Sequence, residues 1–512
     1  MRDLLRPAPN LPDDHYDLVV IGSGMGGLTT ALLMAREGFK VCVLEQHYRP
    51  GGCLHRFFRK RVPFDTGLHY LGGVGEGGTL GKYLRCLGVL DKLSFHALDP
   101  DGYDVLRFPG YEFKVPAGWD AWQRRMHGEF PGERAKVDRY VEAVRRICRE
   151  SFAYSFERPD ESPGAFAEVS LGGFLRTIDA SARLRAVIAG QCYLYGVAPD
   201  QAPMEVHAHV VDSMMQGPVG LDGGGDALAK VMMDAIRAQG GTVRTRSKVT
   251  ALEVKDGAIE SCLLEKGERL FGRCFVSNAH PHTTLDLLPA GTFKPAYVNR
   301  VREMKNSVGS IAGYYTLEGG PAERRNYNLY WFNSWDVDAC FTRGGFGDRP
   351  GVDDRVIFVT FPSDREADWE GPRVMLALGV MDWGEVEAFG ASKTGKRGPD
   401  YEAFKARHGA ELQRVVEAAV PEYAGTMKQI EISTPLSNRD YTGAVNGGMY
   451  GLARTMNQWG KYALQSRTRL DNLFLTGHSI MMPGVVGVTI GAFVTCSHLL
   501  GFEHVFEKVA RA

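Results

Sequence analysis

Residues 16–45, YDLVVIGSGMGGLTTALLMAREGFKVCVLE, decide the fold of this chain. The run at 16–21 is apolar and rich in β-branched residues, which predicts a buried strand. Apolar residues then recur at helical spacing as far as Gly38, a residue type that often ends helices, and residues 40–44 form a second apolar run. A strand, a helix and a strand within about thirty residues form a β-α-β unit, so we expect a parallel sheet.

The turn between the first strand and the helix carries the pattern G-x-G-x-x-G. Gly22 permits the tight turn, Gly24 lets the backbone approach a pyrophosphate, and Gly27 lets helix and strand pack closely. The helix N-terminus adds free N–H groups and a partial positive charge, both of which favour phosphate. Glu45 ends the second strand about twenty residues further on, where a carboxylate accepts hydrogen bonds from an adenosine ribose. Because strand, glycines, helix and acid occur in this order, the sequence predicts a dinucleotide site rather than a purely structural turn.

A second glycine pair distinguishes between the two common dinucleotides. Gly51 and Gly52 follow Glu45 closely. Flavoproteins carry such a pair to approach FAD, whereas an NAD domain has no need of it. The later glycine cluster at 73–78 has no clean strand before it and no acid-ended strand after it, so we interpret it as a flexible turn before a helix at 80–87. The sequence therefore predicts FAD and shows no sign of a dedicated nicotinamide domain.

Related patterns return in the middle and near the end of the chain. Residues 223–249 contain a glycine turn, an amphipathic helix and a strand. A hairpin is expected around Asp256-Gly257, and short buried strands are expected at 274–278 and 472–477. We assign these segments to the same domain as residues 16–45.

The intervening segments differ in pattern. Residues 118–216 are mostly helical in spacing, and residues 307–381 hold four β-rich runs, followed by a helix that ends before Pro421. We therefore expect an α/β protein in which a discontinuous Rossmann-like FAD-binding domain, of the glutathione reductase and amine oxidase type, is interleaved with an α+β substrate-binding domain. The predicted ranges are 1–75, 220–285 and 465–512 for the FAD-binding domain and 76–219 and 286–464 for the substrate-binding domain.

Composition and charge narrow the classes of partner and compartment. The 60 Lys and Arg residues nearly balance the 61 Asp and Glu residues, with no long single-sign run, so we expect no nucleic-acid partner. The nine cysteines include no Cys-x-x-Cys pair, which fits a reducing compartment. The N-terminus carries prolines and acids where a signal peptide needs an apolar core, so we expect a cytoplasmic protein. The apolar segment 480–500 is long enough to be weighed as a membrane span, but its glycines and polar residues favour a buried core helix.

Several longer motifs resemble the phytoene desaturase and carotenoid isomerase superfamily, and within it the retinol saturase branch. The resemblance covers nearly the whole chain, with highly specific motifs in the FAD-binding segments and a loose match in the substrate domain. The motifs are EQHYRPGGCLHRF (45–57), FDTGLHYLG (64–72), GGGDALAKVMMDAI (223–236), SNAHPHTT (277–284) and NLFLTGHSIMMPGVVGVTIGAF (472–493).

The resemblance implies FAD contacts at both ends of the chain. The pyrophosphate would lie against the opening glycines and near Gly477, and the turn at Gly487 would direct a helix N-terminus at the pyrimidine edge of the flavin. Related desaturases and amine oxidases often carry arginine after the glycine pair, where this chain has Cys53; this departure favours the saturase-like branch. The implied cofactor-binding set is Gly22, Gly24, Gly26, Gly27, Glu45, Gln46, Gly51, Gly52, Cys53, His69, Val249, Gly477, His478, Gly487 and Val488.

The implied activity is redox chemistry on the carbon–carbon double bonds of an apolar polyene, such as a retinoid, carotenoid or related isoprenoid lipid. We expect saturation by hydride from reduced FAD, with His69, Tyr450 and His478 as candidate proton-handling residues. Alternatives on the same scaffold are cis–trans isomerisation, desaturation and amine oxidation. A protein of the GDP-dissociation-inhibitor type, which binds isoprenoid lipid without catalysis, is the non-enzyme alternative. The electron donor is unknown, and an apolar substrate is compatible with a peripheral membrane contact.

Two further patterns are given structural interpretations. His207 with His209, and His280 with His282, form H-x-H pairs, a spacing that can bind metal. Neither pair has a cysteine or carboxylate cluster beside it, and positions two apart on a helix face different directions, so we expect structural roles and no metal. The aromatic run at 327–335 alternates like a strand with one aromatic face, which either lines a substrate tunnel or packs in the core.

Overall fold

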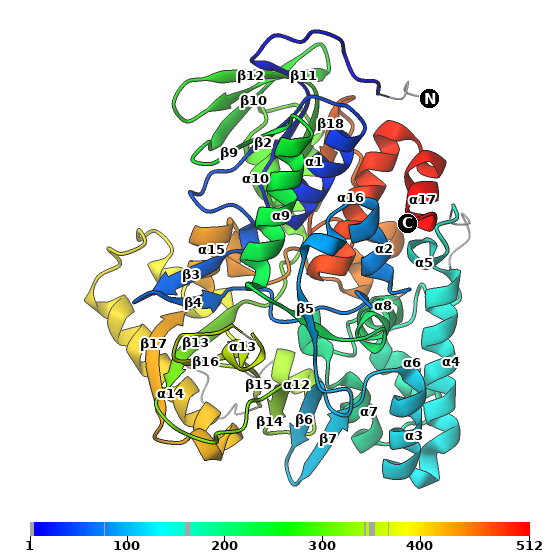
Figure 1. Cartoon of the computed structure of the whole chain (residues 1–512), viewed down its shortest axis with the longest axis vertical. Helices are drawn as coiled ribbons and strands as arrows, with labels where there is room; N and C mark the ends of the chain where they lie inside the picture. Colours follow the sequence, from blue (N-terminus) through cyan, green and yellow to red (C-terminus); the bar gives the residue numbers. More distant parts are fainter. Residues whose placement is uncertain (1–4, 76, 159–163, 343–344, 348–353, 367) are drawn as a thin grey trace.

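Two β-sheets and the helices around them build the molecule, with the first sheet at the top of Figure 1 and the second below it. The structure, a computed structural model, describes residues 5–75, 77–158, 164–342, 345–347, 354–366 and 368–512.

The first sheet contains the predicted β-α-β unit. Strand β1 (His15–Ile21) pairs in parallel with β2 (Val41–Leu44), and α1 (Met25–Arg36) connects them. Within the described residues the strand order is β10-β11-β12-β1-β2-β9, and β18 (Leu473–Leu475) lies beside β12. Helix α1 packs against α9 (Gly224–Ala238) and α16 (Gly484–Leu500), and these helices bury one face of β1 and β2. The other face is buried in a separate apolar cluster with residues of β10, β11 and β12. The predicted parallel sheet is confirmed.

An antiparallel extension completes this sheet. The hairpin predicted around Asp256-Gly257 is present between β10 and β11, and both turn residues have positive φ, 50° and 81°. A tight hairpin turn needs this conformation to match the twist of its strands. The strands are β9 (Thr242–Arg244), β10 (Val249–Lys255), β11 (Ala258–Leu264) and β12 (Arg269–Ser277).

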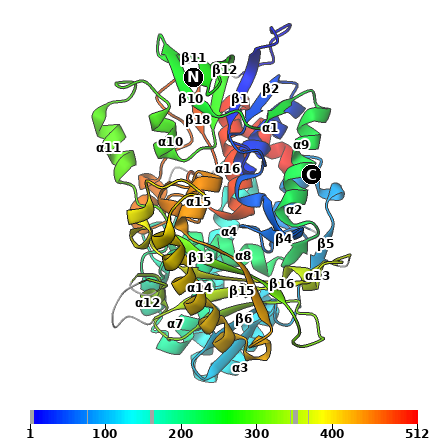
Figure 2. The same cartoon turned by 90° about the vertical axis from the view of Figure 1, so that its left-hand side faces the viewer.

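The second sheet confirms the four β-rich runs, which become β13 to β16. Its order, for the part of the chain that the structure describes, is β17-β13-β16-β15-β14-β6-β7, and the pairing is antiparallel except between β14 and β6. The predicted helix before Pro421 is α14 (Pro399–Ala419), which covers one face, as Figure 2 shows. The strands are β6 (Asp104–Phe108), β7 (Tyr111–Val115), β13 (Ser310–Leu317), β14 (Asn328–Phe332), β15 (Val356–Thr360), β16 (Arg373–Val380) and β17 (Met427–Ser433).

Helices cover the other face of the second sheet, as the pattern at 118–216 predicts. They are α3 (Trp119–Glu129), α4 (Arg134–Glu150), α5 (Phe152–Ser155), α6 (Leu171–Thr177), α7 (Ala182–Ala189) and α8 (Met204–Met215). The remaining elements connect the two sheets or lie at their edges. They are β3 (Arg56–Arg59), β4 (Val62–Asp65), α2 (Thr79–Cys86), β5 (Phe95–Ala97), β8 (Val219–Leu221), α10 (Pro281–Asp286), α11 (Pro295–Glu303), α12 (Val337–Thr342), α13 (Pro362–Arg365), α15 (Pro435–Thr442) and α17 (Phe502–Ala510).

The apolar segment near the C-terminus is the core helix α16. It packs on α1 and buries most of its residues, including Phe493 and Cys496, which have no exposed surface. Among the helices in the described ranges, none combines the length and the apolar character needed to cross a membrane. The turn predicted at 73–78 precedes α2, as expected; Glu76 within it lies outside the described residues.

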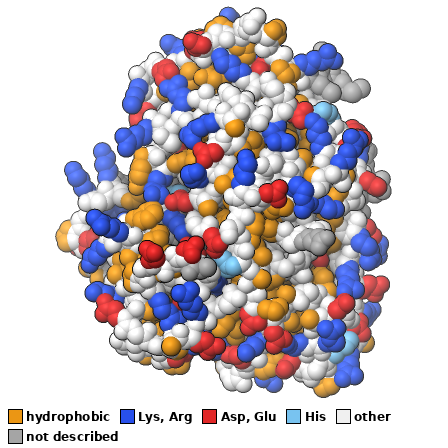
Figure 3. All heavy atoms as spheres, in the orientation of Figure 1, with side chains coloured by type: hydrophobic (Ala, Val, Ile, Leu, Met, Phe, Trp, Pro, Cys, Tyr) orange, Lys and Arg blue, Asp and Glu red, His pale blue; other side chains and the backbone are white. Residues whose placement is uncertain are grey.

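Both sheets are assembled from segments that are distant in the sequence. The first takes strands from 15–44, 242–277 and 473–475, and the second from 104–115, 310–380 and 427–433. The α/β fold class is therefore confirmed, and we keep the predicted domain ranges as a proposed division of the chain. Positive and negative side chains are interspersed over the face seen in Figure 3, in line with the balanced composition.

Candidate active site

A cavity of about 850 Å³ lies between the two sheets. Its walls come from the loops after β1, β2 and β12, from residues 66–72, from strands of the second sheet and from the start of α16. One part is lined largely by glycine loops, and the other by apolar and aromatic side chains. The predicted dinucleotide loops and the substrate-domain strands thus face one continuous space.

The first wall of the cavity is glycine backbone contributed by separate loops. Gly22 has a φ of +96°, a conformation that favours glycine. A Cβ at Gly26 would lie 2.8 Å from the backbone of Gly477, so the first and last glycine motifs touch directly. Asn278, just after β12, lies between them, with its side-chain nitrogen 2.8 Å from the position of a Cβ on Gly24. A side chain at Gly24 or Gly26 would collide with Asn278 or Gly477, so the loops can pack this closely only because these residues are glycine. Bare backbone then lines the cavity, and such a wall lets a pyrophosphate approach closely.

Glu45 is buried at the end of β2 and already accepts three hydrogen bonds. Its carboxylate accepts the amide of Ser23 at 3.0 Å, the hydroxyl of Ser23 at 2.6 Å and the amide of His47 at 2.7 Å. Ser23 in turn accepts the amide of Gly51 at 3.0 Å. A carboxylate has about four lone-pair positions, so Glu45 keeps capacity for a ribose hydroxyl. Ser23, which occupies a variable position of the glycine motif, ties the acid to the second glycine pair; its sequence position gives no sign of this role.

Two helix N-termini point at the cavity without an anionic side chain of their own. Neither α1 nor α16 has an acidic residue in its first turn or a side-chain cap. The first-turn residues Met25 and Gly26 of α1, and 484–487 of α16, line the cavity. Free N–H groups and the positive end of each helix dipole therefore act on the same space, where they stabilise negative charge.

A buried arginine holds the loop before α16. The guanidinium of Arg454 donates to the carbonyl oxygens of Leu452, His478 and Met481, at 3.1, 2.7 and 2.6 Å. Burial lowers the pKa of Arg454 to about 10, a value that still leaves it charged. The loop 477–483 is thereby fixed beneath the cavity, and a positive charge is added to that wall. The sequence carries no pattern that marks Arg454.

The loop after Gly51 is anchored by ion pairs to α9. Asp226, in the first turn of α9, accepts the Arg49 guanidinium and the backbone amide of Arg56, both at 2.9 Å. The Arg56 guanidinium also pairs with Asp65 at 2.6 Å, and both side chains are buried. These bonds hold Gly51, Gly52 and Cys53 against the opening glycine turn, where Gly52 approaches Gly24.

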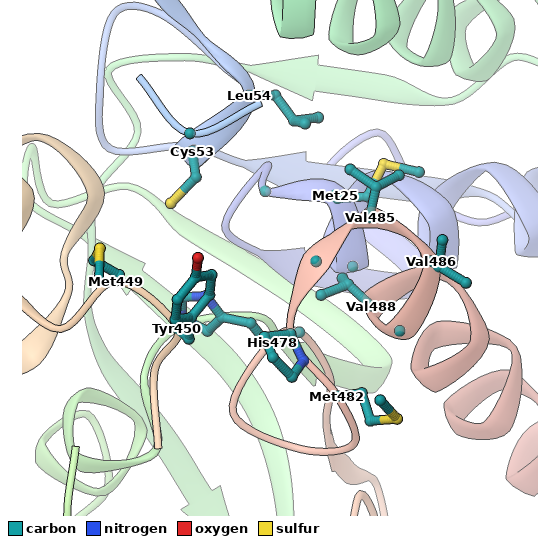
Figure 4. Close-up of a pocket in the computed structure, with 18 of the residues that line it drawn as sticks. Met25, Cys53, Leu54, Met449, Tyr450, His478, Met482, Val485, Val486 and Val488 are labelled. Atoms are coloured by element: carbon teal, nitrogen blue, oxygen red, sulfur yellow. The ribbon is translucent and has the colours of Figure 1, made fainter. Parts of the chain in front are cut away.

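The second part of the cavity is predominantly apolar. In Figure 4, Cys53 and Tyr450 point towards the same space, while Met25, Val485, Val486 and Val488 gather around the starts of α1 and α16. Ala312, Phe358 and Leu378 extend the apolar wall into the second sheet. Tyr330, in the predicted aromatic run, also lines the cavity, whereas its neighbour Trp331 packs on the α14 side; the run therefore serves the cavity and the core at once.

The three candidate proton-handling residues are all partly buried on the cavity wall. Burial lowers the pKa of His69 and of His478 to about 4, with the nearby Arg454 charge adding to the effect at His478. Both imidazoles are therefore neutral at pH 7. Among the residues that the structure describes, neither ring nitrogen of His69 has a hydrogen-bond partner, so both could contact a ligand. Tyr450 donates to the carbonyl oxygen of Tyr193 at 2.9 Å, and burial raises the pKa of Tyr450.

Of the predicted cofactor-binding residues, all but Gly27 line this cavity. A Cβ at Gly27 would lie 2.1 Å from the carbonyl oxygen of Gly22, so Gly27 serves the close packing of helix and strand. The individual contacts of the other residues with a cofactor stay predictions.

The paired histidines contact polar atoms within the protein, and their structural interpretation stays a prediction; His209 contacts the carbonyl oxygen of Glu205 at 2.7 Å. His207 is fully buried and hydrogen-bonds the hydroxyls of Tyr140 and Tyr195, at 2.7 and 3.0 Å. His280 caps α10 by accepting the amide of His282, and its other ring nitrogen contacts Asn306 at 2.8 Å. His282 contacts the carbonyl oxygen of Val301 at 2.8 Å.

Comparison with known proteins finds a matching domain family, homologous enzymes and a solved structure with the same fold. The NAD(P)-binding Rossmann-like domain family matches residues 20–87. The chain is 28% identical to human all-trans-retinol 13,14-reductase, over 96% of this chain and 86% of that protein. It is 25% identical to prolycopene isomerase 2 of an Oncidium hybrid, over 97% of this chain and 86% of that protein. The structure of putrescine oxidase bound to putrescine shares the fold with a TM-score of 0.64 and 14% identity, over 95% of this chain and 99% of that one.

These similarities confirm the fold class and the resemblance read from the motifs. They also agree with a dinucleotide cofactor, flavin or nicotinamide, at the glycine wall. The chain is a Rossmann-type oxidoreductase homologous to the all-trans-retinol 13,14-reductases and the prolycopene isomerases.

Proposed function

We propose that this chain is an FAD-dependent oxidoreductase that saturates a carbon–carbon double bond of an apolar polyene, of the retinoid, carotenoid or related isoprenoid class. One observation carries the proposal: the glycine wall for a dinucleotide and the apolar wall for a lipid bound a single cavity. The substrate class follows the names of the relatives, and the apolar residues of the second sheet support it.

The residues present fit FAD. Gly24, Gly26 and Gly477 line the cavity with bare backbone that a pyrophosphate can approach, and Glu45 keeps capacity for a ribose hydroxyl. The second glycine pair, Gly51 and Gly52, lines the same cavity and favours FAD over a nicotinamide dinucleotide. When bound and reduced, FAD supplies a hydride equivalent at its ring.

The chain itself binds, orients and excludes water. The starts of α1 and α16 stabilise the negative charge of the cofactor, and the loop held by Arg454 keeps α16 in place. The apolar wall of Ala312, Phe358 and Leu378 would hold the polyene and exclude water from the reacting carbons. His69, Tyr450 and His478 stay the proposed residues for positioning a proton or a polar substrate group.

The decisive experiment begins with the flavin and ends with product mass. Purified protein should show a flavin absorption band, or acquire one when mixed with FAD; a preparation that stays colourless in excess FAD would favour the non-catalytic, lipid-binding alternative. The protein is then reduced anaerobically and incubated with retinol, carotenoids or polyunsaturated fatty acids. A gain of two hydrogens supports saturation, an unchanged mass with shifted retention supports isomerisation, and a loss of two hydrogens with oxidised enzyme supports desaturation.

Amine oxidation is the second candidate because putrescine oxidase shares the fold. It predicts hydrogen peroxide release when the oxidised protein meets an amine. Peroxide with amines and no mass change in any polyene would replace the proposed function by this one.

We further propose a cytoplasmic protein that contacts membranes peripherally, since its proposed substrates partition into bilayers. The electron donor is open. Co-flotation with phospholipid vesicles is the expected outcome; protein that stays at the bottom of the gradient argues against the contact.

A further inference from the structure

We propose that Tyr330, Tyr70 and Asp104 form a proton-delivery chain from the core of the second sheet to the cavity. The inference rests on the proposed function, because saturating a double bond consumes one proton for each hydride equivalent. It assigns that proton to residues other than His69, Tyr450 and His478.

Hydrogen bonds link the three side chains in a continuous series. The hydroxyls of Tyr330 and Tyr70 lie 2.8 Å apart, and the Tyr70 hydroxyl donates to the Asp104 carboxylate at 2.8 Å. Tyr330 and Tyr70 are buried residues that line the cavity, whereas Asp104 is buried and does not line it. The distances and burial describe a path from a buried acid to the space where the substrate is proposed to bind.

The pairing of β6 and β14 brings the members together. These strands run parallel, with Asp104 opposite Asn328 and Leu106 opposite Tyr330. Tyr70 approaches from the segment after β4, beside the ring of Phe358, whose centroid lies 6.3 Å from that of Tyr70 and 5.0 Å from that of Tyr330. The packing on Phe358 holds both rings in place, so their hydroxyl oxygens lie within hydrogen-bond distance of each other.

Asp104 has the properties of an acid that exchanges its proton near neutrality. Burial raises its pKa to about 6, against the opposing effects of hydrogen bonds from Asn328, Tyr70 and Gln191 and of the Arg365 charge. The Asn328 and Gln191 amides donate to it at 2.9 and 2.7 Å.

The charged and titratable neighbours of Asp104 are Arg365, Tyr70, Tyr103 and Tyr330. Arg365 is itself buried and donates to the side chain of Asn328 and to the carbonyl oxygen of Tyr327, both at 2.7 Å. Burial raises the pKa of each of the three tyrosines, and the Asp104 carboxylate raises it further, so they stay protonated and can only relay. In contrast, the pKa of His69 and of His478 is about 4, which leaves little imidazolium to donate at pH 7.

The protonation state of Asp104 determines which group donates each hydrogen bond between Asp104, Tyr70 and Tyr330. When Asp104 is ionised, Tyr70 donates to it and Tyr330 donates to Tyr70, so both hydroxyls point away from the cavity. When Asp104 is protonated, it donates to Tyr70, Tyr70 donates to Tyr330, and the Tyr330 O–H is free to point into the cavity. The second arrangement presents an acid to the substrate.

In the proposed reaction, Tyr330 gives one proton to the substrate and Asp104 replaces it through Tyr70. One carbon of the double bond takes the hydride equivalent supplied by the reduced cofactor, and its neighbour becomes electron-rich. A C–H bond forms at that neighbour as the O–H bond of Tyr330 breaks, and the electron pair of the O–H bond stays on the phenolic oxygen. Tyr330 regains a proton from Tyr70, and Tyr70 from Asp104, which is left ionised until a proton from solvent restores it.

The first test measures Asp104 without turnover. Infrared difference spectra of the flavin-loaded protein between pH 8 and pH 5 should show a protonated-carboxyl band that appears near pH 6. The band should be absent in D104N and shifted in Y70F, which removes the hydroxyl that contacts the carboxylate. A wild-type spectrum without such a band, or a band that survives in D104N, overturns the proposal.

The second test measures the proton-dependent step in single turnovers of pre-reduced enzyme. Y330F should slow formation of the saturated product by about 100-fold while flavin absorption and substrate affinity stay as in the wild type. The wild-type rate should fall about tenfold for each pH unit above the pKa of Asp104, and D104N should lose this dependence. A structural role alone would not remove the pH dependence from a folded, flavin-loaded D104N.

Tyr315→Phe is the matched control. Tyr315 is a fully buried phenol of the same sheet, on the α14 side, and its hydroxyl has no hydrogen-bond partner. Y315F should keep the wild-type rate and pH profile. A Y330F variant with the wild-type rate and pH profile would overturn the proposed proton-delivery chain and leave the proposed function intact. A wild type that saturates no polyene, yet shows the Asp104 band, would instead overturn the proposed function.

Discussion

The two walls of the cavity are built in opposite ways. The glycine wall is backbone from short local motifs, held by bonds such as those between Ser23 and Glu45 and between Arg454 and His478. The apolar wall is side chains from strands that are far apart in the sequence, such as β6 and β14. In the proposed function, the first wall would bind a cofactor through shape and dipoles. The second wall would hold the substrate, and its side chains could change without disturbing the first.

The largest effect should come from Gly27, which does not line the cavity but lets α1 pack closely on the Gly22 turn of the glycine wall. In Gly27→Val the side chain would have to displace the Gly22 carbonyl, which lies 2.1 Å from the position of the Cβ. We expect a loss of about 3 kcal/mol in the free energy of unfolding and no flavin binding, measured by urea denaturation and absorption. Gly128→Ala is the control, because nothing lies within 4 Å of its Cβ position in α3. A Gly27→Val protein with wild-type stability would contradict the close packing.

Acid should lower the stability of the protein through His207, a buried histidine of α8. Burial lowers the pKa of His207 to about 3, from an ordinary value of 6.5. The unfolded chain therefore binds more protons between these values, so the stability contributed by neutral His207 is full above pH 6.5 and is lost as the pH falls towards 3. We expect this residue to cost about 2 kcal/mol in the free energy of unfolding at pH 5. His207→Gln should remove that share of the acid sensitivity, measured by urea denaturation at pH 7.5 and pH 5; an unchanged sensitivity would exclude His207 as its source.

A smaller effect is expected from Glu45, whose substitution should lower the affinity for the cofactor but not for the substrate. Glu45→Gln keeps the size of the side chain but removes the charge that accepts the Ser23 and His47 donors. We expect FAD affinity to fall about tenfold, measured by quenching of flavin fluorescence, with little change in substrate KM. The control is Glu260→Gln. Glu260 is an exposed residue of β11, and its carboxylate lies 3.8 Å from the ammonium group of Lys255. An unchanged FAD affinity would remove Glu45 from the site.

The smallest effect should come from the apolar wall. Leu378→Phe adds volume to a residue of β16 that lines the cavity. We expect the KM for a polyene to rise by about threefold, while FAD binding stays as in the wild type. Met375→Leu, on the α14 side of the same strand, is the control. Equal changes in FAD affinity and KM would mean that the two walls are not independent.

Sequence patterns predict the glycine wall well because its geometry is local. Gly22, Gly24 and Glu45 lie within one β-α-β unit, and the spacing of such a unit determines where each residue lies. Ser23, Asn278 and Arg454 escape prediction for a different reason. Serine, asparagine and arginine occur at many surface positions, and only contacts with distant loops make these three part of the wall.

The residues alone determined the Rossmann-type sheet, the hairpin at Asp256-Gly257 and strands β13 to β16 of the second sheet, because hydrophobic period and turn chemistry act over a few residues. Strands β6, β7 and β17 of that sheet were not predicted. The tertiary structure decided that Asp104 lies beside Asn328, that Tyr70 reaches Tyr330, and that both phenols meet the cavity. Asp104 begins the run DVLRF, which reads as an ordinary strand; its chemistry depends on burial and on partners as many as 224 residues away. Local patterns set the elements, and long-range packing set the electrostatic environment of each side chain.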